Sequence, residues 1–322
     1  MLPVASDMHS LDSRVTAVVF PGQGSQKPGM ARDFFERFAV SRDVFSEASD
    51  ALGIDMPALC FDDDPRLDLT EYTQPAILTA EIAMLRALEQ DFGLQGSYWG
   101  GHSLGEYTAL CAAGVVPLSV AARLVRRRGA LMQRAVPAGT GSMVAVIARA
   151  PATWNLAAEL ADIEIDVANR NSPDQVVLSG SAPALEQACA RVAKLLEGVE
   201  YELVRLHVSA PFHSRAMLAI EAEFAEALNE AAPHMRPELA SVVTSNLTGH
   251  FHLPELTAVL DALRRQIRGT VDWIANMRSL SEAATEIVEV GPHRPLRGFF
   301  KSIGREVMSI VSVRTAEKGL AA

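Results

Sequence analysis

The 322-residue sequence lacks any run of about 18 apolar residues, so we expect neither a membrane-spanning helix nor a membrane partner. It is also poor in cysteine, and Cys60, Cys111 and Cys189 form neither a Cys-x-x-Cys pair nor another metal-ligand spacing. We interpret them as small buried side chains and expect no metal site. The odd number of cysteines, and an N-terminal stretch without the apolar run of an export signal, favour a cytoplasmic location.

Positive charge is scarce as well. The 29 Lys and Arg residues are outnumbered by 39 Asp and Glu residues, which gives a formal net charge of −10. Nucleic acid and anionic lipid would be repelled by this excess at long range, so neither is expected as a main partner. Hydrophobic residues make up 49% of the chain, enough for a sizeable core at this length, so we expect a folded globular protein and not a disordered chain.

Alternating strand and helix patterns predict an α/β fold. A β-branched run at 15–20 leads into the glycine loop 21–25, and a second short strand at 98–101 precedes an Ala-rich helix. Further helices are predicted by their periodicity at 30–36, 41–52, 74–90 and 118–135. After Pro211 the same alternation resumes, with helices at 215–232 and 256–266 and strands at 241–245 and 286–290.

The pattern between these two regions has a different order. Strands are predicted at 143–147, 165–169, 175–179 and 201–208, with helices at 151–161 and 182–196. This βαββαβ order is typical of a ferredoxin-like sheet with two helices on one face. We therefore predict a small ferredoxin-like domain over 139–208, inserted into a discontinuous large domain formed by 1–138 and 209–322.

The segment Gly101-His-Ser-Leu-Gly105 fits G-x-S-x-G, in which a serine stands on a sharp turn between strand and helix. Both glycines are needed there because a side chain would strike the neighbouring backbone. The helix N-terminus after Ser103 would favour an oxyanion. The alternative is an ordinary Gly-Ser turn before a helix.

A serine nucleophile requires a general base within hydrogen-bond reach. His213 is one candidate, because it lies in a loop just after the point where the chain re-enters the large domain, and such a loop can reach the turn at Ser103. The alternative is a capping or surface histidine. His207, within a predicted strand, is interpreted as structural. His102 adjoins Ser103, but we expect its side chain to point away from it.

Several segments together resemble the malonyl-CoA:acyl carrier protein transacylases and the acyltransferase domains of polyketide synthases, and the resemblance covers about residues 15–304. The matching segments, in order, are Phe20-Pro-Gly-Gln-Gly-Ser-Gln26, Gly101-His-Ser-Leu-Gly-Glu-Tyr107, Arg128-Gly with Met132-Gln133, Asn171-Ser-Pro with Gln175, Ala210-Pro-Phe-His-Ser214 and Glu289-Val-Gly-Pro292. The resemblance implies an α/β-hydrolase-like large domain with a parallel sheet core and a ferredoxin-like insert.

Residue by residue, the resemblance implies that Ser103 is the nucleophile and His213 its base. No acidic third member is implied, because the backbone carbonyl of Gln266 would orient the imidazole; a polar residue on an amphipathic helix is the alternative for Gln266. The backbone N–H groups of Gln23 and Leu104 would form the oxyanion hole. A phosphate-binding glycine loop is disfavoured, because the G-x-G-x-x-G spacing and a following Lys-Ser/Thr are both missing.

The family's substrate pocket would be lined by Arg128, Phe212 and His102. A guanidinium offers a planar fork to a carboxylate, so Arg128 would select acyl groups that carry one, such as malonyl. The alternative, a solvated helix face, is expected for two of the three neighbours Arg123, Arg126 and Arg127. Phe212 would collide with a branch on the acyl α-carbon, although it could equally be packing.

The implied reaction is ping-pong malonyl transfer from malonyl-CoA to the phosphopantetheine thiol of an acyl carrier protein, in polyketide or fatty acid synthesis, without metal or redox cofactor. Three alternatives remain: another acyl donor, such as methylmalonyl-CoA or a carrier-bound acyl group; a proofreading acyl-thioester hydrolase; or a non-catalytic docking subunit. A basic C-terminal patch is predicted to dock the carrier protein, with an ordinary solvated surface as the alternative. Its residues are Arg264, Arg265, Arg268, Arg294, Arg297, Lys301 and Arg305.

Overall fold

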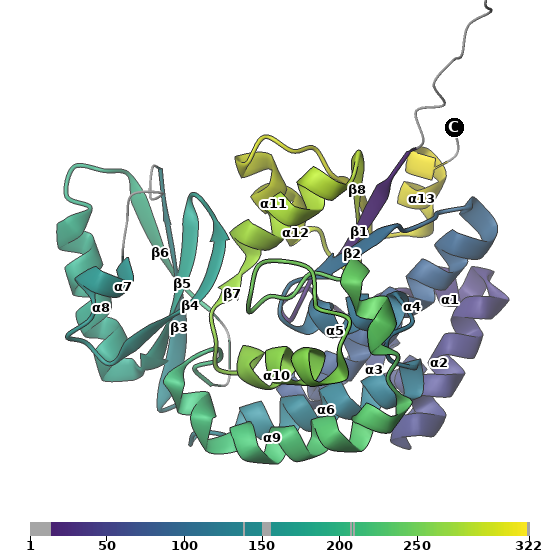
Figure 1. Ribbon diagram of the computed structural model, residues 1–322, viewed down its shortest axis with the longest axis horizontal. Helices are drawn as coiled ribbons and strands as arrows, with labels where there is room; N and C mark the ends of the chain where they lie inside the picture. The colour runs from purple at the N-terminus through teal and green to yellow at the C-terminus, as the bar shows by residue number, and fades with distance from the viewer. Residues whose placement is uncertain (1–13, 138, 150–155, 207, 209, 321–322) are drawn as a thin grey trace, which may run out of the picture.

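The computed structural model describes residues 14–137, 139–149, 156–206, 208 and 210–320 and contains two β-sheets (Figure 1). Four parallel strands form the first sheet in the order β2-β1-β8-β9. They are β1 (Thr16–Phe20), β2 (Tyr98–Gly101), β8 (Glu286–Val290) and β9 (Met308–Ile310). All five residues of β1 are buried, as expected for a central parallel strand covered on both faces.

Alternate side chains of β1 enter two different cores. Val18 and Phe20 pack with α4 (Thr70–Phe92) and α5 (Leu104–Ala112), whereas Ala17 and Val19 pack with α11 (Trp273–Ala283) and α12 (Pro295–Ser302). The remaining helices of this part are α1 (Arg32–Arg37), α2 (Ala39–Leu52), α3 (Met56–Phe61), α6 (Leu118–Arg134), α9 (Leu218–Ala231), α10 (Leu256–Gln266) and α13 (Val313–Leu320). Short 3₁₀ helices lie at η1 (Pro65–Asp68), η3 (Arg215–Met217), η4 (Ala232–His234) and η5 (Pro237–Val242).

No helix within the described ranges is both long and apolar enough to cross a bilayer. The longest apolar helix, α4, is instead buried on most sides between α2, α5 and α6.

The second sheet stands apart from the first, at the left of Figure 1. Its strands run in the order β6-β3-β5-β4-β7, and the first four are antiparallel. They are β3 (Gly141–Ala148), β4 (Ile165–Ser172), β5 (Gln175–Ser181) and β6 (Tyr201–Arg205), with α7 (Leu156–Glu159) and α8 (Ala182–Leu195) packed on the sheet around a core of its own. This order confirms the predicted ferredoxin-like arrangement.

The fifth strand of this sheet was not predicted. The two-residue β7 (Val271–Asp272) lies far along the chain and pairs in parallel with β4 through Asn169↔Val271 and Arg170↔Asp272. The second sheet is therefore mixed, and it is joined directly to the segment that leads into α11. The predicted domain boundaries stay a prediction, and residues 138 and 209 lie outside the described part.

Some predicted elements differ from those observed. The predicted strand at 241–245 is wrong: η5 occupies Pro237–Val242, and Val243 and Thr244 form only isolated bridges. A proline at the first helical position favours a helical turn there over the β-branched pair that suggested a strand. The predicted strand at 201–208 ends at Arg205, and His207 lies outside the described residues. Part of the predicted helix at 151–161 also lies outside them, and the observed α7 is short.

Candidate active site

Ser103 occupies the sharp turn between β2 and α5. Its φ of 54° and ψ of −97° are uncommon for a residue with a side chain. A Cβ on Gly101 would lie 2.0 Å from the backbone of Gly105, and one on Gly105 would lie 2.2 Å from the carbonyl oxygen of Phe20. The two glycines of the motif therefore permit a close approach of strand and helix, as predicted for a nucleophile elbow.

His213 reaches this turn from a segment 110 residues further along the chain. Its Nε2 lies 2.7 Å from Ser103 Oγ, and its Nδ1 lies 2.9 Å from the backbone carbonyl oxygen of Gln266. Because a carbonyl oxygen only accepts, Nδ1 carries the proton, and Nε2 of the neutral imidazole is free to accept the serine hydroxyl. Burial, followed by the positive charge of Arg128, lowers the pKa of His213 to about 3, so the imidazole is neutral at pH 7.

Arg128 extends from α6 into the same site and is only 1% exposed. Its Nη2 donates to Ser103 Oγ at 3.1 Å and to Gln266 Oε1 at 3.0 Å, and its Nη1 donates to Gln74 Oε1 at 2.9 Å. Its guanidinium carbon lies 5.1 Å from the ring centre of Tyr107. Among the described residues no carboxylate lies within 4.0 Å of this guanidinium, and its Nε has no hydrogen-bond partner. A buried cation beside the serine is thus available to an anionic ligand.

The other predicted site residues surround this centre. Gln23 follows β1 in the glycine loop, which packs on the elbow: a Cβ on Gly22 would lie 2.4 Å from the carbonyl oxygen of His102. Leu104 is the first residue of α5, so its N–H has no acceptor within the helix. Phe212 is buried, and its carbonyl oxygen accepts from Ser179 Oγ at 2.7 Å.

The side chain of His102 contacts Asn171 and Trp273. Its Nε2 lies 2.7 Å from Asn171 Oδ1 on β4, and its ring packs edge-on against Trp273 at 5.7 Å. The ring therefore links the elbow to the second sheet. A cavity of about 330 Å³ lies beside α7 and β4, and His213, Arg268, Gly269 and Thr270 complete its lining.

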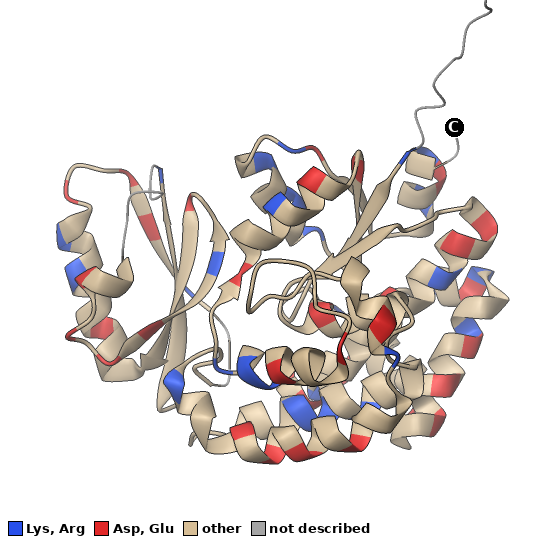
Figure 2. Ribbon diagram, in the orientation of Figure 1, with Lys and Arg blue, Asp and Glu red and all other residues tan. Residues whose placement is uncertain are grey.

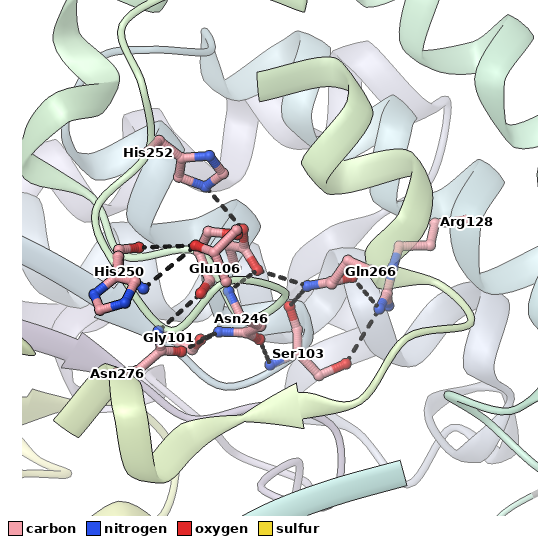
Figure 3. A network of polar contacts seen from close by, with 11 residues as sticks. Gly101, Ser103, Glu106, Arg128, Asn246, His250, His252, Gln266 and Asn276 are labelled. Atoms are coloured by element: carbon pink, nitrogen blue, oxygen red, sulfur yellow. Dashed lines mark hydrogen bonds and ion pairs between the residues drawn. The ribbon is translucent and has the colours of Figure 1, made fainter. Parts of the chain in front are cut away.

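Sequence reasoning missed the polar network behind the elbow (Figure 3). The side chain of Gln266, expected to act only through its backbone, donates from Nε2 to the Ser103 carbonyl oxygen and to Glu106 Oε2, both at 2.9 Å. Asn246 accepts the Ser103 N–H at 2.6 Å. Glu106 lies three residues after the nucleophile, in the matched motif, which was the one available signal for it. No sequence pattern marks Asn246.

The basic C-terminal patch is partly neutralised by ion pairs. Arg264 pairs with Glu221 and Asp261, and Arg268 also pairs with Glu221. In Figure 2, red acidic positions recur along α9, which contains no Lys or Arg, whereas both red and blue positions lie on α10. Within the described ranges no ion pair involves Arg294, Arg297 or Lys301. Carrier docking at this patch stays a prediction.

An α/β fold with a parallel sheet and a second, mixed sheet, and a serine hydrogen-bonded to histidine at a strand-to-helix turn, defines an acyl-transfer class of protein. Residues 17–316 match the family model described as the acyl transferase domain. The malonyl CoA-acyl carrier protein transacylase of Escherichia coli (strain K12) is 38% identical over 298 residues, which is 89% of this chain and 92% of that protein. The Bacillus subtilis (strain 168) protein of the same description is 34% identical over 300 residues, 91% of this chain and 92% of that protein.

Solved structures agree with these relatives. The malonyl CoA-acyl carrier protein transacylase of Clostridium perfringens is 34% identical and superimposes with a TM-score of 0.87 over 95% of this chain and 96% of that chain. A type II PKS malonyl-transacylase, solved in complex with its acyl-carrier protein, is 33% identical, with a TM-score of 0.86 over 95% of this chain and 99% of that one. The chain belongs to the malonyl CoA-acyl carrier protein transacylase family.

Proposed function

We propose that this chain transfers a malonyl group from malonyl-CoA to the phosphopantetheine thiol of an acyl carrier protein, for fatty acid or polyketide synthesis. The relatives and the family membership support the reaction. The observation that carries the proposal for the site is that one hydroxyl, Ser103 Oγ, lies 2.7 Å from a neutral histidine and 3.1 Å from a buried arginine without a carboxylate partner. This arrangement suits an acyl group that has a thioester at one end and a carboxylate at the other.

In the first half-reaction, Ser103 Oγ attacks the thioester carbonyl while His213 Nε2 takes its proton. The N–H groups of Leu104 and Gln23 would hold the oxyanion, a contribution for which each donor is typically worth about 3 kcal/mol. The carbon–sulfur bond then breaks, and the imidazolium returns its proton to the departing CoA thiolate. A malonyl-serine ester remains.

The second half-reaction reverses these steps with a different thiol. His213 takes the proton from the carrier's phosphopantetheine thiol, and the sulfur attacks the malonyl-serine ester. The new thioester forms as the bond to Ser103 Oγ breaks, and the histidine returns the proton to the serine. No metal or redox cofactor takes part in this scheme.

Arg128 would bind the malonyl carboxylate and thereby discriminate against acetyl groups, which lack one. Phe212 would stand against a branch on the acyl α-carbon, and His102 would line the same pocket. The buried guanidinium favours this reading over a hydrolase that accepts uncharged acyl chains, and the aligned serine and histidine disfavour a non-catalytic docking subunit. We also propose a cytoplasmic location, which the three unpaired cysteines favour.

Intact-protein mass spectrometry tests the proposal. After brief exposure to malonyl-CoA, we expect one malonyl adduct on the wild-type chain and none on Ser103→Ala, with weaker labelling by methylmalonyl-CoA and acetyl-CoA. Addition of a carrier protein that bears phosphopantetheine should discharge the adduct onto the carrier. Release of free malonate instead would indicate a hydrolase, and an adduct that survives in Ser103→Ala would refute the assignment of the nucleophile.

A further inference from the structure

A buried carboxylate lies behind the nucleophile elbow and takes no part in the mechanism above. Glu106, in the first turn of α5, is fully buried, and three donors converge on its two oxygens (Figure 3). Its Oε2 accepts from Gln266 Nε2 at 2.9 Å and from the backbone N–H of Asn246 at 3.0 Å. Its Oε1 lies 2.8 Å from Nε2 of His252, which is also buried.

The two residues that share Oε2 also hold both peptide groups of the nucleophile. Asn246 Oδ1 accepts the Ser103 N–H at 2.6 Å, and Gln266 Nε2 donates to the Ser103 carbonyl oxygen at 2.9 Å. A residue with a φ of 54° and a ψ of −97° keeps this conformation only when its surroundings impose it. The strained turn is therefore fastened on both sides by residues that Glu106 connects.

The same glutamine contacts the base and the arginine. Its Oε1 accepts from Arg128 Nη2 at 3.0 Å, and its backbone carbonyl oxygen accepts from His213 Nδ1 at 2.9 Å. An amide can be turned so that its oxygen and nitrogen exchange places. A carboxylate only accepts and a guanidinium only donates, so Glu106 on one side and Arg128 on the other allow a single orientation of Gln266.

We propose that Glu106 is a positioning residue. One of the two assays that test this role uses malonyl-CoA and therefore rests on the proposed function. Glu106 fixes the orientation of Gln266 and the place of the loop at Asn246, and through them the alignment of the nucleophile, the base and the arginine. It touches neither the substrate nor the reacting atoms. The requirement is for a hydrogen-bond acceptor at Oε2, not for a negative charge.

Three single variants and one double variant test this role: Glu106→Gln, Glu106→Leu, Gln266→Met, and Glu106→Leu combined with Gln266→Met. One readout is the rate at which a fluorophosphonate modifies Ser103, which needs neither malonyl nor CoA. The second is the ratio of kcat/KM for malonyl-CoA to that for acetyl-CoA, which reports on the placement of Arg128. Glu81→Gln is the matched control, because Glu81 is also fully buried and bonds to α5 through Thr108 Oγ1, away from these residues.

We expect Glu106→Leu to slow the fluorophosphonate reaction by about 100-fold, the cost of misplacing reacting groups by about 1 Å. The malonyl-to-acetyl ratio should fall as well. Glu106→Gln should stay within about threefold of wild type, because its amide oxygen can replace Oε2 while His252 Nε2, in its other tautomer, accepts from the amide nitrogen. Gln266→Met should reproduce most of the loss, and the double variant should be no slower than the slower single variant.

Equal losses in Glu106→Gln and Glu106→Leu would overturn the proposal in favour of a charge effect on the site. Additive losses in the double variant, with both acyl donors affected in proportion, would overturn it in favour of general packing. If Glu106→Leu does not fold, wild type, Glu106→Gln and Gln266→Met still test the positioning role of Glu106. Full activity of Gln266→Met would refute that role. A wild-type chain that reacts with fluorophosphonate but gains no malonyl adduct would refute the proposed function alone.

Discussion

At the scale of single residues, the burial of His213 has a consequence for the pH dependence of catalysis. Its pKa is lowered to about 3, first by burial and then by the charge of Arg128. The neutral base is therefore present throughout the range above about pH 4. We expect the acid limb of kcat/KM for malonyl-CoA to lie below pH 5 instead of near 6.5, the ordinary value for histidine.

The measurement is kcat/KM between pH 4.5 and 8. Arg128→Gln, assayed with acetyl-CoA, provides the comparison: it removes the second cause of the shift, so its acid limb should move to higher pH. A wild-type limb between pH 6 and 7 that Arg128→Gln leaves in place would show that His213 titrates as an exposed histidine does.

Much of this centre could be predicted because it lies in local motifs. Ser103 was marked by its flanking glycines, and the resemblance supplied His213, Arg128 and the Gln266 carbonyl. Glu106 and Asn246 could not be assigned a contact, because the hydrogen bonds that join them to Gln266 and Ser103 span 140 residues or more. Such contacts depend on how the whole chain folds, which no short pattern specifies. The catalytic roles themselves stay predictions.

At the scale of elements, the loop that carries His213 is fastened to β4 by an ion pair. The carboxylate of Asp166 accepts from the backbone N–H of Arg215 at 2.8 Å and from its guanidinium at 3.0 to 3.2 Å. Arg215 opens η3, two residues after the histidine. An exposed ion pair contributes about 0.2 to 1 kcal/mol to stability, but this one also joins the segment that carries His213 to β4.

We therefore expect Asp166→Ala to reduce kcat about five- to tenfold by loosening the His213 loop, while the melting temperature falls by only a few degrees. Steady-state kinetics and thermal unfolding measure the two effects. Asp162→Ala is the control, because the exposed pair of Asp162 with Arg191 has a similar forked geometry and lies away from the site. Equal effects of the two substitutions on kcat would show that the ion pair between Asp166 and Arg215 does not position His213.

Most of the predicted elements match observed ones, including the short strands β2 and β8, but the helices α11, α12 and α13 were not predicted. The helices at 41–52, 118–135 and 256–266 were placed within about two residues of α2, α6 and α10. The six-residue α3 and the three-residue β9 were missed, because so few residues carry no recognisable period. The sheet partner of β4 was missed for the same reason, since β7 has only two residues.

At the scale of the whole molecule, two buried glutamates interact electrostatically across the packing of α4 on the parallel sheet. Glu81 on α4 is fully buried, with one oxygen bonded to Thr108 and the other without a partner among the described residues. Burial raises its pKa well above the ordinary value, and the nearby charge of Glu289 raises it further. Burial also raises the pKa of Glu289, on β8, to about 7.

The sign of the effect on stability follows from proton linkage. Above pH 4.5 an unfolded chain releases both protons, whereas the folded chain retains them until each raised pKa is passed. The folded state therefore binds more protons, and the free energy of unfolding contributed by these groups falls as the pH rises. For Glu289 this loss occurs between about pH 4.5 and 7, and for each such group it amounts to about 1.4 kcal/mol per pH unit within its window. Neutral buried His213 acts in the opposite direction below pH 6.5, so only the difference between variants isolates the glutamates.

Glu81→Gln keeps an acceptor for Thr108 and has no proton to release, so it should remove the contribution of Glu81 to this loss. We expect the variant to gain stability relative to wild type as the pH rises from 5 to 8, by more than 1 kcal/mol in the free energy of unfolding. Urea unfolding at several pH values measures the difference, with exposed Glu306→Gln as the control that should show none. A difference between Glu81→Gln and wild type that is constant across this range would mean that the folded protein holds Glu81 ionised, with its charge stabilised by groups around α4.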